Sequence, residues 1–300
     1  MSENRVRISL TVYDYPAGDV IPLARAAEEA GFDAIWVGEH YVSPRVFTSE
    51  HPSANPADEH PAARIVGPSV RLHDPWCFLG GVAGATTRLK IGTAISIVPL
   101  NHPLLLARSV LTAQEISGGR VLFGTGAGWL REEYDALNIP FETRAARYDE
   151  MIDIMRRAWA GGYFEHAGEH FRFGAVQLTP HRVDVPLIIG GNSERALRRV
   201  AKKADGWLNS AMIDLAEAER LRDRIEVLRR EYGTDERPFR YYVRPPRPER
   251  EDIERYAAAG FHDIVLWGPQ VWSTDVEATL QDKRATLRRV AENLGLPVAT

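Results

Sequence analysis

Short runs of β-branched and apolar residues alternate with longer amphipathic runs along most of the 300-residue chain. The short runs have the length of strands, and in the longer ones apolar residues recur every three or four positions, as in a helix that packs on one face. Strands are expected over 6–12, 34–37, 89–95, 121–125, 186–189, 206–209, 239–243 and 263–267. Helices are expected over 20–30, 75–85, 103–116, 144–159, 193–203, 215–231, 250–259 and 275–293.

Strands and helices alternate strictly in this pattern, which is typical of parallel strands joined by helical crossovers. Eight such units are enough to close a (β/α)₈ TIM barrel. Two stretches interrupt the rhythm: 41–74, a long loop after the second strand, and 161–184, whose alternating aromatic residues predict a hairpin before the fifth strand. Because no Gly/Ser-rich linker divides the chain, we expect one domain over residues 1–300.

Composition and charge argue against nucleic-acid-binding and membrane proteins. The chain is 44% hydrophobic and 26% charged, with a net charge of −4, which is ordinary for a globular protein and offers no basic patch for nucleic acid. No run of about 18 apolar residues predicts a membrane span, and the first 20 residues lack the apolar core of a signal peptide. We therefore expect a cytoplasmic protein without nucleic-acid or membrane partners. The single cysteine, Cys77, lies in an apolar stretch and is expected to be a small buried side chain.

The chemistry of a (β/α)₈ barrel is concentrated where strands end and βα loops begin. The second strand ends in Gly38-Glu39-His40. An acid and an imidazole at this position are suited to general acid–base chemistry, although a hydrogen-bonded loop histidine gives the same pattern. The other histidines of the long loop lack metal-ligand spacing, and no Gly-x-Ser-x-Gly elbow is present, so neither a metal site nor that type of hydrolase is expected.

Small residues follow three further strands. Thr93, Ala94 and Ile95 end the third strand, where small side chains let a flat ring approach the backbone or pack inside the barrel. The fourth strand leads into Gly126-Ala127-Gly128, which is compatible with an anion-binding loop or with a tight turn. It is not the dinucleotide fingerprint, which requires Gly-x-Gly-x-x-Gly.

After the fifth strand the chain reads Gly190-Gly191-Asn192-Ser193 and enters a helix. The free amides and partial positive charge of a helix N-terminus favour phosphate binding there.

Taken together, these motifs resemble the bacterial luciferase-like monooxygenase superfamily, and most closely its short, deazaflavin-dependent (coenzyme F420) branch. The segments that carry the resemblance lie in the family's order and spacing between about residues 5 and 210: 26–36, 38–40, 91–93, 117–121, 124–134, 147–150, 189–193 and 204–207. Each motif alone is weak, but the set is specific.

The resemblance implies a barrel with insertions, usually a homodimer. It implies a non-proline cis peptide at Ala94–Ile95 behind the deazaflavin ring, with 126–128 and 190–193 holding the ribityl chain and phosphate. The family's acid–histidine pair matches Glu39 and His40, and the equivalent histidine is catalytic in the sugar-phosphate dehydrogenase of this branch. That enzyme has a glutamate where this chain has Trp129, so a more apolar substrate is expected.

The leading hypothesis is hydride transfer between a small organic substrate and C5 of F420, with His40 as proton donor or acceptor oriented by Glu39. Trp129 and the 41–74 loop would cover the substrate, and Tyr13, Trp267 and Trp272 would line its pocket. One alternative is a two-component FMN monooxygenase supplied by a separate reductase. A non-catalytic flavin-binding protein and, more remotely, a metal-dependent barrel hydrolase are the others.

Overall fold

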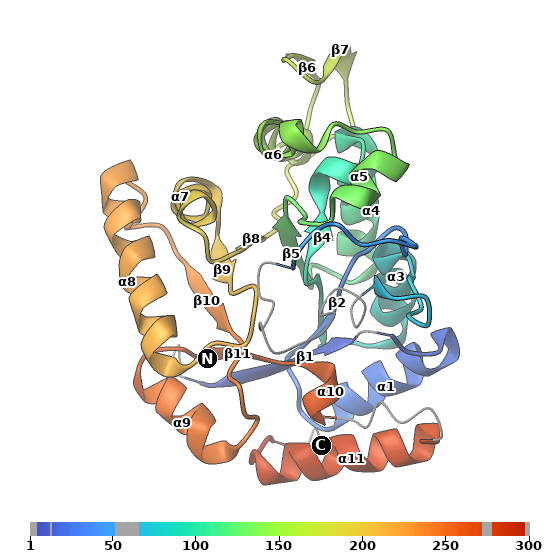
Figure 1. Cartoon of the computed structure of the whole chain (residues 1–300), viewed down its shortest axis with the longest axis vertical. Coiled ribbons are helices and arrows are strands. Elements are labelled where there is room, and N and C mark those ends of the chain that lie inside the picture. The colour runs from blue at the N-terminus through green and yellow to red at the C-terminus, as the bar shows by residue number, and fades with distance from the viewer. Residues whose placement is uncertain (1–4, 13, 52–65, 272–277, 298–300) are drawn as a thin grey trace.

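The computed structural model describes residues 5–12, 14–51, 66–271 and 278–297. Its main sheet is parallel, with the order β3-β2-β1-β11-β10-β9-β8-β5-β4, and a further β3–β5 pairing closes it into a ring (Figure 1). The expected closed barrel of eight parallel strands is confirmed. The barrel strands are β1 Arg7–Val12, β2 Ala34–Val37, β3 Lys90–Thr93, β5 Val121–Gly126, β8 Leu187–Gly190, β9 Gly206–Leu208, β10 Arg240–Val243 and β11 Asp263–Leu266.

Helices surround this ring (Figure 1). The long ones are α1 Ala17–Glu29, α3 Pro75–Ala85, α4 Pro103–Ile116, α6 Arg144–Trp159, α7 Glu194–Lys203, α8 Leu215–Tyr232, α9 Arg250–Ala258 and α11 Leu280–Asn293. Their ends follow from local chemistry: Asp74 caps α3 by accepting a hydrogen bond from the Cys77 amide, with Pro75 at the first position, and α8 ends at Gly233 with φ 64°. Among the described residues, no helix has the length and apolar character needed to cross a bilayer.

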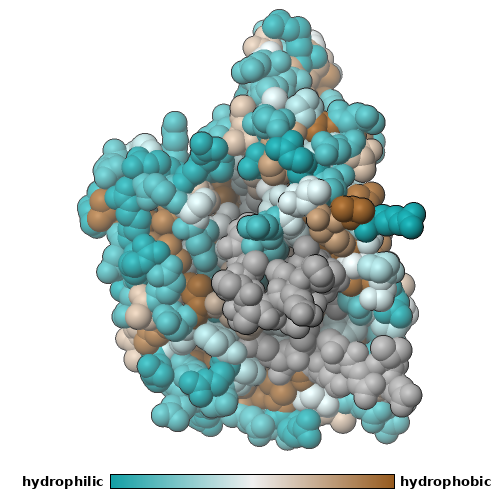
Figure 2. Space-filling view, viewed as in Figure 1, coloured by the Kyte–Doolittle hydropathy of each residue, from teal (hydrophilic) through white to brown (hydrophobic). Residues whose placement is uncertain are grey.

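The expected hairpin before the fifth barrel strand is present as β6 Phe164–Ala167 paired antiparallel with β7 Arg172–Val176. It projects beyond α6 as a largely hydrophilic finger (Figures 1 and 2). The fold also contains short elements that periodicity did not predict, because each is shorter than two helical turns: α5 Arg131–Ala136, α10 Gly268–Val271, and the 3₁₀ turns Val98–Leu100 and Phe141–Thr143.

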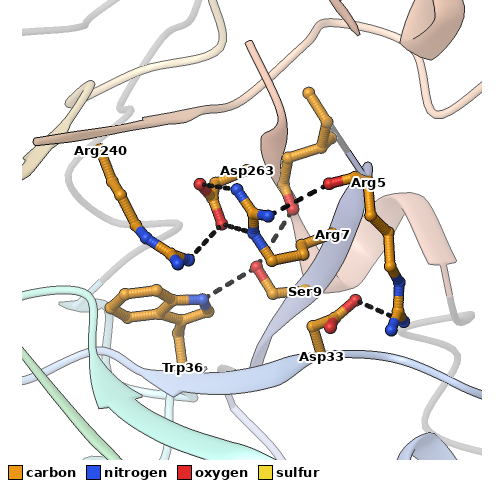
Figure 3. A network of polar contacts seen from close by, with 8 residues as sticks. Arg5, Arg7, Ser9, Asp33, Trp36, Arg240 and Asp263 are labelled. Carbon is orange, nitrogen blue, oxygen red and sulfur yellow. Dashed lines mark hydrogen bonds and ion pairs between the residues drawn. The ribbon is translucent and has the colours of Figure 1, made fainter. Parts of the chain in front are cut away.

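Side chains fill the inside of the barrel in layers, as alternation along each strand requires. The central layer is apolar and comprises Ala34, Trp36, Leu122, Ile188, Leu208, Tyr242 and Val265, with Ala94 and Ile95 packed against it. At the N-terminal end of the strands, Arg7 donates to Asp263 through Nε at 2.6 Å and Nη2 at 2.7 Å, and Trp36 donates to Ser9 (Figure 3). These polar side chains form the N-terminal layer of the barrel, beneath the apolar central layer.

Two expectations need correction. The prediction that Cys77 is buried is wrong: its side chain is exposed, because the buried face of α3 is formed by Pro75, Leu79, Val82 and Ala83 and position 77 lies off that face. The strand expected over 89–95 ends at Thr93, and the chain resumes as the short strand β4 Ser96–Ile97 beyond a break in the ladder at residues 94 and 95.

Candidate functional site

The floor of the barrel mouth is formed by Ala94 and Ile95 on the apolar central layer. The peptide bond between them is cis, as expected. Glycines at the ends of β5 and β8 face this floor: a Cβ on Gly126 would lie 2.2 Å from Cδ1 of Ile95, and one on Gly190 would lie 3.0 Å from its Cγ2. The ends of β5 and β8 therefore meet the segment after β3 at one apolar surface made of small residues and Ile95.

Beside this floor, two glycines adopt backbone conformations that disfavour other residues. Gly128 has φ +73° and Gly191 has φ +123°. A Cβ on Gly128 would lie 2.7 Å from Cγ2 of Ile97. The loop after β5 and the turn into α7 thus depend on glycine.

The start of α7 carries free amides suitable for an anion. Ser193 caps the helix by accepting a hydrogen bond from the Ala196 amide at 3.3 Å, and Asn192 accepts one from the Ser210 amide at 3.1 Å. Glu194 lies in the first turn, but its carboxylate is paired with Arg224 and Arg198, so its charge is largely neutralised. The N-terminal amides of α7 can therefore donate hydrogen bonds to a phosphate group.

His40 follows β2 at the mouth and is held by a glutamate that the sequence did not single out. Its Nδ1 lies 3.1 Å from both carboxylate oxygens of Glu133, on α5, and the side chains are only 9% and 1% exposed. Glu133 also accepts a hydrogen bond from the Tyr41 amide. Because a carboxylate can only accept, Nδ1 carries a proton and Nε2 is the basic atom of the neutral ring.

The expectation that Glu39 orients His40 is wrong. Neighbouring residues of an extended segment point to opposite sides, and Glu39 turns instead to the segment after the cis bond. Its carboxylate accepts hydrogen bonds from the Ser96 hydroxyl at 2.8 Å, the Ile97 amide at 2.6 Å and the Tyr41 hydroxyl at 3.2 Å. Burial raises the pKa of Glu39 to about 7, although these hydrogen bonds oppose the shift.

Aromatic rings and an open hollow lie next to His40. Trp129 contacts the imidazole edge-on, with 6.0 Å between ring centroids, and also packs against His51 at 4.9 Å. A hollow of about 350 Å³, open to solvent, is lined by His40 together with residues from the ends of β1 and β2 and from 71–78. Trp129 thus lies beside the imidazole, and its role in covering the substrate stays a prediction.

The predicted covering loop is only partly described. Thr48 and Ser49 donate hydroxyl hydrogen bonds to Glu132 on α5, at 2.7 and 2.8 Å, so this part of the loop is tied to the element that carries Glu133. Tyr13 and Trp272 lie outside the described residues, whereas Trp267 directly follows β11 at the mouth. Within the described ranges, no group of three or more His, Cys, Asp or Glu side chains is arranged to hold a metal ion.

Comparison with known proteins identifies relatives over the whole chain. The family model for luciferase-like monooxygenases matches residues 2–294. An uncharacterized protein of Mycobacterium tuberculosis (strain ATCC 25618 / H37Rv) is 31% identical over 278 residues, which are 91% of this chain and 93% of that protein. An FMNH(2)-dependent dimethylsulfone monooxygenase of Pseudomonas fluorescens (strain Pf0-1) is 30% identical over 138 residues, 45% of this chain and 38% of that protein.

Among solved structures, an F420-dependent secondary alcohol dehydrogenase in complex with an F420-acetone adduct superposes with a TM-score of 0.72. The superposition covers 97% of this chain and 99% of that one, at 16% sequence identity. At this identity the likeness establishes the fold alone. These proteins thus include one FMN-dependent enzyme that is similar in sequence and one F420-dependent enzyme that is similar in fold.

Proposed function

Because this chain belongs to the luciferase-like monooxygenase family, whose members are oxidoreductases that use a flavin or deazaflavin, we propose that it is an F420-dependent enzyme. It would transfer a hydride between the C5 atom of the deazaflavin and a small organic substrate. The observation that carries this proposal is the imidazole of His40, held at the mouth by the buried carboxylate of Glu133. Oxidation of an alcohol by hydride loss also releases the hydroxyl proton, and a positioned base is needed to take it.

The residues of the mouth fit a deazaflavin. Ala94 and Ile95 offer an apolar floor, and a Cβ at Gly126 or Gly190 would press on the side chain of Ile95. The loop at 126–128 and the residues 190–193 at the start of α7 would hold the ribityl chain and the phosphate. Bound F420 supplies the hydride acceptor or donor.

In this arrangement the chain's own groups position the substrate and move its proton. Nε2 of His40 would accept the proton from the substrate hydroxyl, or return it in the reverse direction, while Glu133 keeps Nδ1 protonated and stabilises the imidazolium. Trp129 would cover the substrate and exclude water from the mouth. Glu39 would have a different role: it accepts hydrogen bonds from Ser96 and Ile97 and would thereby fix the position of the neighbouring floor residues Ala94 and Ile95.

Replacing His40 with Ala tests this role. We expect turnover of a panel of secondary alcohols and carbonyl compounds, followed by F420 absorbance, to fall about 100-fold or more, with the F420 dissociation constant within about threefold of wild type. The exposed hairpin-side residue His181 offers a matched control, since His181→Ala should change neither quantity. Undiminished turnover in His40→Ala would disprove the proton-transfer role.

The second candidate is a two-component monooxygenase that uses reduced FMN from a separate reductase. It is favoured by the similarity to the dimethylsulfone monooxygenase over 138 residues. Titration of the apo-protein with F420 and with FMN, followed by tryptophan quenching, separates the two candidates. F420 should bind at least about tenfold more tightly; tighter FMN binding would transfer the assignment to the monooxygenase. Substrate-dependent oxidation or reduction of the bound cofactor, measured across a substrate panel, excludes a non-catalytic binding protein in either case.

A further inference from the structure

An arginine that the proposed mechanism does not use lies at the mouth of the barrel. Strand β10 points alternate residues inward: Arg240 approaches Asp263 at the N-terminal end (Figure 3), and Tyr242 packs edge-on against Trp36 in the central layer. The next inward position is Arg244, immediately after the strand. Side-chain alternation therefore places its guanidinium one layer above the apolar core, in the mouth.

The backbone of Arg244 is fixed in this orientation. Its amide donates a hydrogen bond to Oδ1 of the buried Asn209 at 2.8 Å, and its carbonyl accepts one from the Ile213 amide at 3.0 Å. Pro245 follows and disfavours helical dihedrals at the residue before it. The inward direction of the side chain is thus imposed by the local chain.

Two of the three guanidinium nitrogens of Arg244 are buried without a hydrogen-bond partner among the described residues. The residue is 8% exposed, and its Nε and Nη2 have no hydrogen-bond partner in the described parts of the chain. Desolvation lowers its pKa to about 10. By contrast, the equally buried Arg229 donates to the carbonyls of Thr234 and Arg237 and pairs with Glu226. A buried cation that lacks hydrogen-bond partners lowers the stability of the folded protein. A ligand that supplies hydrogen-bond acceptors to this guanidinium would therefore stabilise the fold.

We propose that Arg244 binds an oxyanion group of the substrate, so that the enzyme acts on small organic anions such as carboxylates. This inference rests on the proposed function and specifies its substrate class. The small-residue floor for the cofactor lies at β3, β5 and β8, whereas Arg244 belongs to β10, beyond β9. The guanidinium therefore lies on the side of the ring away from that floor, where it is available to substrate.

The position of His40 agrees with this assignment. In the ring, β1 and β11 separate β2 from β10, and the two strands lie on different sides of the barrel (Figure 1). A substrate in the mouth can thus place its reacting carbon near His40 and its anionic end on Arg244. The planar fork of arginine suits a carboxylate, which it binds through two parallel hydrogen bonds.

Binding of simple probes to the apo-protein tests the proposal without cofactor or turnover. Benzoate and its neutral counterpart benzyl alcohol would be titrated by calorimetry into wild type, Arg244→Met, Arg244→Lys and Arg182→Met. Arg182 is 75% exposed and pairs only with Asp184 among the described side chains. Arg182→Met therefore removes the same charge from the protein as Arg244→Met, but at a surface position. We expect benzoate to bind wild type and Arg182→Met at least about tenfold more tightly than benzyl alcohol, a preference lost in Arg244→Met and reduced in Arg244→Lys.

Thermal unfolding and F420 titration give independent readouts. Arg244→Met should raise the melting temperature by a few degrees, because it removes an unpaired buried charge, and should leave F420 affinity unchanged. No preference for benzoate in wild type, or an unchanged preference in Arg244→Met, would overturn the proposal. Loss of F420 affinity in Arg244→Met would also overturn it and assign the guanidinium to the cofactor. Failure of wild type to bind F420 would count against the proposed function and leave the anion test intact.

Discussion

At the scale of single residues, the site depends on the hydrogen-bond partners of two buried glutamates. Glu39 and Glu133 are both buried, but Glu133 contacts His40 whereas Glu39 contacts the segment at 96–97. One carboxylate is therefore placed to orient the imidazole and the other to hold the floor. Substitutions by glutamine remove each charge with little change of shape and separate the two roles.

We predict that Glu133→Gln lowers turnover about 10- to 100-fold and leaves F420 affinity within about threefold of wild type, because the amide no longer stabilises the imidazolium or enforces the Nδ1–H tautomer. Steady-state kinetics and a cofactor titration measure both effects. Glu142→Gln, on an exposed residue paired with Arg131, is the control and should behave as wild type. A Glu133→Gln enzyme with full kcat would show that His40 needs no orienting carboxylate.

Glu39 makes stability depend on pH. Burial raises its pKa from 4.5 to about 7, so the native state keeps a proton that the unfolded chain releases. The protonated side chain of Glu39 contributes fully to the free energy of unfolding below pH 4.5, and this contribution is lost as the pH rises from 4.5 to 7. Above pH 7 no further loss occurs. At pH 8 we expect Glu39→Gln to be more stable than wild type by roughly 3 kcal/mol.

Urea unfolding of Glu39→Gln and wild type at pH 5 and pH 8 measures this difference. The gap in free energy of unfolding should be small at pH 5 and large at pH 8. A gap that does not change with pH would mean that Glu39 titrates near its ordinary range in the folded protein.

At the scale of elements, β5 shows how one strand serves both fold and site. Leu122, Gly124 and Gly126 point into the barrel, while Phe123 packs outward into the main core and Thr125 meets the Tyr148 hydroxyl. The two inward glycines face different neighbours. A Cβ on Gly124 would lie 1.8 Å from the carbonyl oxygen of Thr93, whereas one on Gly126 would meet the terminal methyl of Ile95.

We therefore expect opposite outcomes for two identical substitutions on this strand. Gly124→Ala should lower the free energy of unfolding by about 2–4 kcal/mol, because the clash is with backbone of the adjacent β3. Gly126→Ala should cost less than about 1 kcal/mol, since Cδ1 of Ile95 can rotate, but should weaken F420 binding about tenfold by pushing that methyl into the floor. Denaturant unfolding and fluorescence titration of the two variants provide the comparison, with Gly174→Ala, which meets open space, as control. Unimpaired F420 binding by Gly126→Ala would exclude Ile95 from the cofactor site.

At the scale of the whole molecule, the first strand of the barrel pairs with the last. Arg7 on β1 and Asp263 on β11, 256 residues apart, form a two-bonded ion pair at the end of the barrel remote from the mouth (Figure 3). Hydrogen bonding to Asp263 raises the pKa of Arg7. The side chains are 20% and 9% exposed, so this pair is screened much less than one on the surface.

Asp263→Asn should lower the free energy of unfolding by about 2–3 kcal/mol, because it leaves Arg7 partly buried and poorly paired, while kcat stays at the wild-type value. Asp184→Asn is the matched control: it removes an ion pair whose side chains are 75% and 79% exposed, and we expect a change within about 0.5 kcal/mol. Thermal or urea unfolding and steady-state kinetics measure both variants. Equal losses in the two variants would show that barrel closure does not depend on this pair.

The sequence by itself determined the order of strands and helices, and with it the barrel, because each element carries its own periodicity and end signals. The helix bounds 75–85, 103–116 and 144–159 are those of α3, α4 and α6. It also placed the candidate chemistry at strand ends, since parallel strands bring all their C-terminal ends to one face. The bond at Ala94–Ile95 was located through family resemblance.

Only the tertiary structure decided which side chains meet. Glu133 lies 93 residues from His40 in sequence, on a six-residue helix too short for periodicity to detect, so no local pattern could join them. Adjacency in sequence suggested Glu39 instead, although neighbouring residues of an extended segment point apart. Arg244 likewise looks like an ordinary arginine in the sequence. Its burial and its lack of a partner in the described chain arise only when the ring closes and side-chain alternation turns it into the mouth.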